Sequence, residues 1–177
     1  FAGFTCLCTV FMTLSPMGRK YTFMEAVFGW CFELLAWNLI ARTATVIAIN
    51  LQHISWKEDC LMFIIPQHKS DKKGEGKAKE KHVYANPLDP AICPMLGMAV
   101  MLLCRHRGGK GEKFDSRLFC GDSVDRFSKL LGVVLNDESL IPEDVNLGAL
   151  RSDLGTHSNR KGSSSFLCSL TAALSAV

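Results

Sequence analysis

The sequence lacks the cysteine and histidine spacing of a metal site. Its eight cysteines include no Cys-x-x-Cys pair. Cys6 and Cys8 stand too close together, and Cys93, Cys104 and His106 show no paired spacing. We therefore expect no structural zinc. Most of the cysteines lie inside apolar runs, which indicates buried thiols in a reducing compartment rather than a disulfide framework.

The sequence also lacks an apolar run long enough to cross a membrane. Residues 1–14 are apolar, but a spanning helix needs about 20 residues. They have neither the basic start nor the cleavage site of a signal peptide. The apolar stretch 21–40 contains Glu25 and Glu33, and each charge would cost about 2.5–3.5 kcal/mol at the centre of a bilayer. We expect no membrane partner, and a core or partner-facing helix over residues 1–14.

No Gly-x-Ser-x-Gly motif is present, so a serine hydrolase that uses His157 has no support. The chain of 177 residues is long enough for one domain with a core, and its 48% apolar and 21% charged content is ordinary. A formal net charge of +3 permits a polyanionic partner without requiring one.

Apolar periodicity predicts a predominantly helical chain. Trp30 and Trp37 are expected to fill the core, whereas Glu25 and Glu33 are expected to face solvent. Asp89 is expected to cap a helix that begins with a proline. The predicted helical segments are 21–40, 92–104, a segment through 127–134 that Asp122 or Ser123 caps, and 166–177 after three serines.

Short β-branched runs predict a small sheet between the first two helices. Residues 46–51, continued by 54–56, form the first expected strand; 60–66 form the second and 82–85 the third. The predicted fold class is therefore α+β, mostly helical, with a small three-stranded antiparallel sheet.

A lysine-rich loop lies between the second and third expected strands, over residues 67–82. Lys72, Lys73 and Lys77 lie within it beside two glycines. This loop is either a solvated tip or a segment that lies along a phosphate backbone, where neutralised phosphates release counterions.

Two further parts of the sequence carry cationic side chains that could bind an anion. His157 and Arg160 lie three residues apart, a spacing that places both on one face of a helix, with Lys161 beside them. A guanidinium matches phosphate oxygens, and an imidazole can move a proton near neutral pH. The same stretch also suits a solvated helix start capped by Thr156 or Ser158. Arg42 follows the first long helix. Its positive charge either stabilises the negative C-terminal end of that helix dipole or binds an anion.

Several short stretches stand in an ordered series. They are Trp37-Asn38-Leu39 with Arg42, His53-Ile54-Ser55-Trp56, Lys69-Ser70-Asp71, residues 82–88, and residues 154–162. This series resembles the catalytic domain of tyrosine recombinases, the phage-integrase-like DNA strand-exchange enzymes. Within that group it looks most like the recombinases of Crypton-type eukaryotic mobile elements.

The resemblance implies a catalytic set of Arg42, Lys69, His157 and Arg160, with Lys72 as the alternative lysine. In the family, a tyrosine attacks a DNA phosphodiester and forms a phosphotyrosyl link, without a metal or cofactor. Protein cations must therefore stabilise the charge on the phosphate oxygens. The resemblance also implies DNA contacts from Lys72, Lys73, Lys77 and Lys161.

The sequence departs from the family at the nucleophile. Its tyrosines, Tyr21 and Tyr84, precede the position where the family carries the nucleophilic tyrosine. We therefore expect residues 1–18 to be a remnant helix and linker, and 19–177 a truncated, inactive catalytic domain of a transposable element. Double-stranded DNA, a homo-oligomer on DNA and the nucleus are the implied partners and location. The alternative is a non-catalytic DNA-binding module derived from a mobile element.

Overall fold

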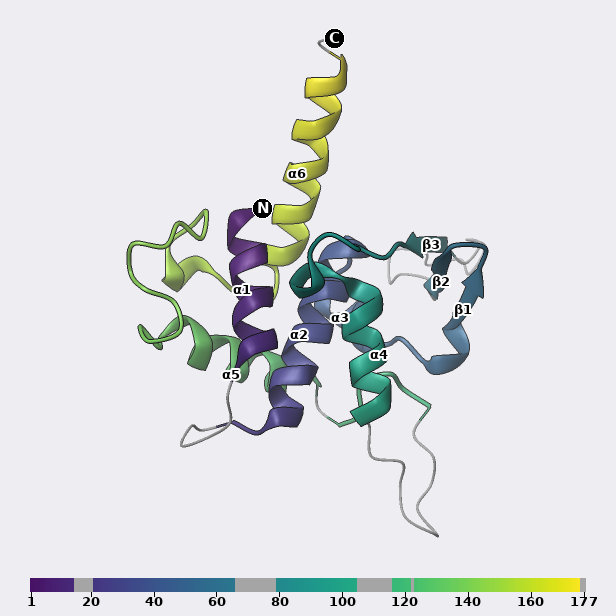
Figure 1. Cartoon of the computed structure of the whole chain (residues 1–177), viewed down its shortest axis with the longest axis horizontal. Coiled ribbons are helices and arrows are strands. Elements are labelled where there is room, and N and C mark those ends of the chain that lie inside the picture. The colour runs from purple at the N-terminus through teal and green to yellow at the C-terminus, as the bar shows by residue number, and fades with distance from the viewer. Residues whose placement is uncertain (15–20, 66–78, 105–115, 122, 176–177) are drawn as a thin grey trace, which may run out of the picture.

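The fold is arranged around one buried helix, α2 (Phe23–Asn38). We describe it from a computed structural model, which describes residues 1–14, 21–65, 79–104, 116–121 and 123–175. Helices α1 (Ala2–Thr13), α4 (Pro94–Cys104), α5 (Ser123–Leu135) and α6 (Ser158–Ser175) pack against α2 (Figure 1). Mostly helical architecture with a small antiparallel sheet confirms the predicted fold class.

Helix α2 starts at a capping box and is covered on every side over its central turns. The Thr22 hydroxyl accepts from the Glu25 amide at 3.2 Å, and the Glu25 carboxylate accepts from the Thr22 amide at 2.6 Å. Every residue from Ala26 to Ala36 is buried. Trp30 fills the core as predicted, and its indole donates to the Ala91 carbonyl at 2.7 Å. Trp37 is half-buried against the core.

The prediction that Glu33 faces solvent is wrong, because its side chain is fully buried. An amphipathic surface helix would leave its charged residues on an open face. Helix α2 has no such face over its central turns, since α1, α4, α5 and α6 surround it.

The sheet contains β1 (Ile54–Lys57), β2 (Cys60–Ile65) and β3 (Lys79–Val83), in the order β1-β2-β3. Both pairings are antiparallel, as predicted, and Phe63 of β2 lies opposite Lys81 of β3. Phe63, Ile65 and Val83 anchor the sheet in the core.

The strand predicted over residues 46–51 is wrong. The chain forms the short helix α3 (Thr43–Ile47) and the 3-10 turn η1 (Leu51–His53) instead. Val46 and Ile49 are both fully buried. Their spacing of three places them on one side of a helical turn that faces α2 and α5, so burial overrides the β-branched composition.

Helix α4 begins close to its predicted start at residue 92, whereas α6 begins at Ser158, earlier than the predicted start at residue 166. Asp89 caps the turn η2 (Pro90–Ile92), accepting from the Ala91 amide at 3.0 Å, and α4 follows it. Helix α6 runs without a break through the three serines at 163–165. The Ser163 hydroxyl donates to the Arg160 carbonyl at 3.3 Å, so this serine satisfies its polar group within the helix.

Helix α1 shares the core with α2 through Phe4, Leu7 and Phe11. The N-terminal turns of α6 pack on the body, and the rest of that helix extends away from it (Figure 1). Among the described residues, no helix is long and apolar enough to cross a membrane.

Candidate anion-binding site

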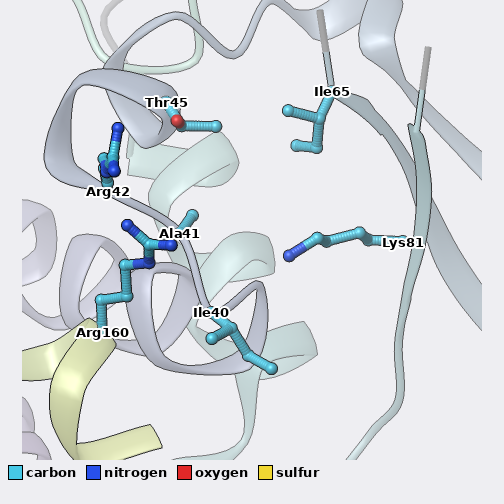
Figure 2. A pocket seen from close by; sticks show the side chains of 7 residues that line it. All are labelled: Ile40, Ala41, Arg42, Thr45, Ile65, Lys81 and Arg160. Atoms are coloured by element: carbon cyan, nitrogen blue, oxygen red, sulfur yellow. The ribbon is translucent and has the colours of Figure 1, made fainter. Parts of the chain in front are cut away.

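A small cavity lies where the end of α2, strand β3 and the start of α6 meet. Its volume is about 140 Å³. Figure 2 shows that Arg42 and Arg160 lie on one side of this cavity and that the Lys81 side chain extends toward them from the sheet. The lining residues are Ile40, Ala41, Arg42, Thr45, Ile65, Lys81 and Arg160.

Arg42 is delivered by a tight turn at the end of α2. The Ala41 amide donates to the Ala36 carbonyl at 3.1 Å, and the Ile40 amide donates to the Trp37 carbonyl at 3.0 Å. This is the Schellman pattern, in which the intervening residue adopts a left-handed conformation. That residue is Ile40, with a φ of 49°. A β-branched residue is strained there, and such strain is typical of functional sites.

Lys81 enters the cavity from the middle of β3. Its ammonium group donates to the carbonyl of Leu39, the C-terminal cap of α2. Partial burial lowers the pKa of Lys81, and the positive charges of Lys79 and Arg160 lower it further. The lysine is therefore a better proton donor than an ordinary surface lysine.

Arg160 lies in the first turn of α6 and is directed into the cavity. The Ser158 hydroxyl accepts from the Gly155 amide at 3.0 Å, which ties down the chain that enters the helix. His157 is exposed and does not line the cavity, and Lys161 is exposed as well.

The structure thus brings together Arg42 and Arg160, two residues of the predicted catalytic set, but not His157. The predicted lysines Lys69, Lys72, Lys73 and Lys77 lie outside the described residues. The catalytic and DNA-binding roles of all these residues remain predictions.

Sequence reasoning missed Lys81. The sequence pattern predicts a third strand that begins at His82, whereas the strand begins at Lys79. The signal was present, because residues two apart on a strand share a face and Lys81 lies two before the buried Val83. A strand extended by three residues would have predicted an inward-facing lysine.

The cavity is suited to an anion. Three cationic groups line it, and none of its lining residues is acidic. Two isoleucines form part of its wall, and an apolar wall strengthens the attraction between a bound anion and the cations. Within the described ranges, no group of three or more histidine, cysteine or acidic side chains could hold a metal ion.

Comparison with solved structures finds a known protein with a similar fold. The chain superposes on an FLP recombinase–Holliday junction complex with a TM-score of 0.63 and 11% sequence identity. The chain shares the fold of this tyrosine recombinase. The alignment covers 93% of this chain and 38% of the recombinase chain. No protein-family model and no curated protein sequence matches the chain.

Proposed function

We propose that the cavity binds a phosphodiester of double-stranded DNA. The observation that carries this proposal is the convergence of Arg42, Lys81 and Arg160 in one cavity of a recombinase-like fold. Guanidinium groups pair with phosphate oxygens through two parallel hydrogen bonds, so two arginines suit the two non-bridging oxygens of a phosphodiester.

In this proposal Lys81 faces one of the bridging oxygens. Its lowered pKa favours proton donation to a leaving oxygen, as strand cleavage requires. Lys69 stays a separate prediction, because it lies outside the described residues.

We further propose a place in DNA recombination and integration, as a Crypton-type, nuclear recombinase domain that assembles as a homo-oligomer on DNA. The ordered sequence motifs support the Crypton-type assignment, and the recombinase-like fold supports the coarser proposal of DNA recombination. The cleavage step of the family also needs a tyrosine nucleophile, and no tyrosine is among the described residues that line the cavity.

The second candidate is a non-catalytic DNA-binding module, and the placement of the two tyrosines favours it. Tyr21 is buried and lines a different hollow, beside Asp125 and Arg126. Tyr84 is 54% exposed and lines a groove next to Trp37. Neither tyrosine lines the cationic cavity, so neither is in place to attack a phosphate bound there.

The proposal is tested by the affinity for a short DNA duplex at low salt, measured by fluorescence anisotropy. We expect Arg160→Ala to weaken binding about tenfold, the equivalent of about 1.4 kcal/mol. Arg160→Lys should recover only part of the loss, because an ammonium group cannot pair bidentately. Lys129→Ala removes an exposed cation from α5 and should leave the affinity within about twofold of wild type.

A wild-type protein that does not bind duplex DNA would contradict the proposal, and so would an Arg160→Ala variant with wild-type affinity. A nicked suicide duplex separates the two candidates. A protein–DNA adduct that survives detergent indicates a recombinase, whereas binding without an adduct indicates the non-catalytic module.

A further inference from the structure

Two hydrogen bonds between residues distant in sequence join the body to the first turn of α6 and to the segment just before it. The Asn159 side chain is 8% exposed, and its amide donates to the carboxyl group of Glu33 at 2.6 Å. The buried Thr43 hydroxyl donates to the Thr156 carbonyl at 3.1 Å. Asn159 immediately precedes Arg160, and Thr43 immediately follows Arg42.

These contacts lie on the face of α6 that is turned toward the body. Asn159 and Ser163 are one turn apart and both buried, so they define the inward face of α6. Successive residues of a helix are separated by about 100° around its axis. A rotation of the helix that released Asn159 would therefore also move Arg160 away from the cavity.

Glu33 and Asn159 form a polar pair inside the contact between α2 and α6, where two apolar side chains could pack equally well. Glu33 is fully buried in α2, and its second carboxyl oxygen has no hydrogen-bond partner in the described part of the chain. Replacement of a buried polar pair by apolar residues is often neutral for stability. A hydrogen bond differs from apolar packing in being directional, and a buried group that loses its partner is costly.

We propose that Glu33 and Asn159 are positioning residues for the cationic cavity. Their hydrogen bond, with that between Thr43 and Thr156, sets the rotation of α6 and keeps the Arg160 guanidinium beside Arg42 and Lys81. This inference rests on the proposed function, in which the cavity binds a phosphate, but the position of Arg160 can be tested without DNA.

The pKa of Lys81 depends on whether Arg160 lies in the cavity, so its measurement detects the position of Arg160. The positive charge of Arg160 contributes to lowering the pKa of Lys81, together with burial and Lys79. When Arg160 leaves the cavity, the pKa of Lys81 must rise. Arg160→Ala gives the reference value for an absent guanidinium.

The experiment is an NMR titration of the full chain with isotope-labelled lysine, in which Lys81→Arg assigns the signal. We expect Asn159→Leu to raise the pKa of Lys81 to the Arg160→Ala value. The double variant Glu33→Leu/Asn159→Leu should do the same, since it removes both partners and leaves no unpaired polar group.

Two variants serve as controls. Glu33→Gln keeps an oxygen that accepts from Asn159 and should keep the wild-type pKa of Lys81. Asn136→Leu removes an exposed asparagine that bonds only locally, to the Gly132 carbonyl at 2.8 Å, and should also have no effect.

A folded double variant with the wild-type Lys81 pKa would overturn the proposal. A double variant that does not fold cooperatively would also overturn it, because the pair would then serve folding rather than position. Lack of DNA binding by the wild type would contradict only the proposed function, since the Lys81 titration needs no DNA.

Discussion

At the scale of single residues, burial shifts the pKa values of two ionisable groups, Lys81 in the cavity and Glu33 in α2. Lys81 and Glu33 are both perturbed chiefly by loss of water, but in opposite directions. Burial disfavours the charged form of each, so it lowers the pKa of the lysine and raises that of the carboxyl group.

Glu33 gives the protein a pH-dependent stability. Burial raises its pKa to about 7 from an ordinary value of 4.5, although the bond from Asn159 opposes the rise. Between these values the folded state keeps a proton that the unfolded state releases, so stability falls as the pH rises. We expect the free energy of unfolding to fall by about 3 kcal/mol across this pH window and to change no further on account of Glu33 at higher pH.

The measurement is the free energy of unfolding in urea from pH 4.5 to pH 8, for the wild type and Glu33→Gln. The difference between the two proteins isolates Glu33, because their other titrating groups are shared. Glutamine at position 33 has no proton to lose, so the stability of Glu33→Gln relative to the wild type should increase as the pH rises. A difference that stays constant with pH would show that Glu33 does not titrate in this window.

At the scale of elements, the sequence predicted most helices and the sheet, but not the boundaries that define the site. The β-branched composition of the strands and the cap at Asp89 are local signals, and both can be recognised from the sequence. The turn at 40–42, the helix α3 and the inward face of β3 depend on what packs against them. Glu33 was misplaced for the same reason, since only the folded molecule shows that α6 covers it.

Helix α6 approaches α2 closely at Gly162. A Cβ atom there would lie 2.9 Å from the Trp37 ring, closer than packed atoms allow. Gly132, in α5, has open space around its Cβ position and provides a matched comparison within a helix.

We expect Gly132→Ala to stabilise the protein by about 1 kcal/mol through helix propensity. Gly162→Ala should instead destabilise it by about 1–3 kcal/mol, because overpacking displaces α6 from Trp37. Thermal unfolding of both variants tests this pair. Equal stabilisation by the two alanines would mean that α6 does not pack on Trp37 as described.

At the scale of the whole molecule, the cationic cavity depends on complete folding. Its cations come from the end of α2, from β3 and from α6, which are far apart in the sequence. From sequence alone, Arg42 and Arg160 could be predicted to meet only through the resemblance to recombinases. Composition is uninformative here, because a net charge of +3 says nothing about where the cations gather.

Under the proposed function, Arg42 and Arg160 hold one DNA phosphate. The most direct test is the slope of log binding constant against log salt concentration, for the double variant Arg42→Ala/Arg160→Ala. The control, Lys57→Ala/Lys129→Ala, removes the same charge from exposed positions outside the cavity. Loss of one phosphate contact should reduce the magnitude of the slope by about 0.9 in the cavity variant, whereas the control should keep the wild-type slope. An unchanged slope in the cavity variant, or an equal reduction in both, would contradict the account.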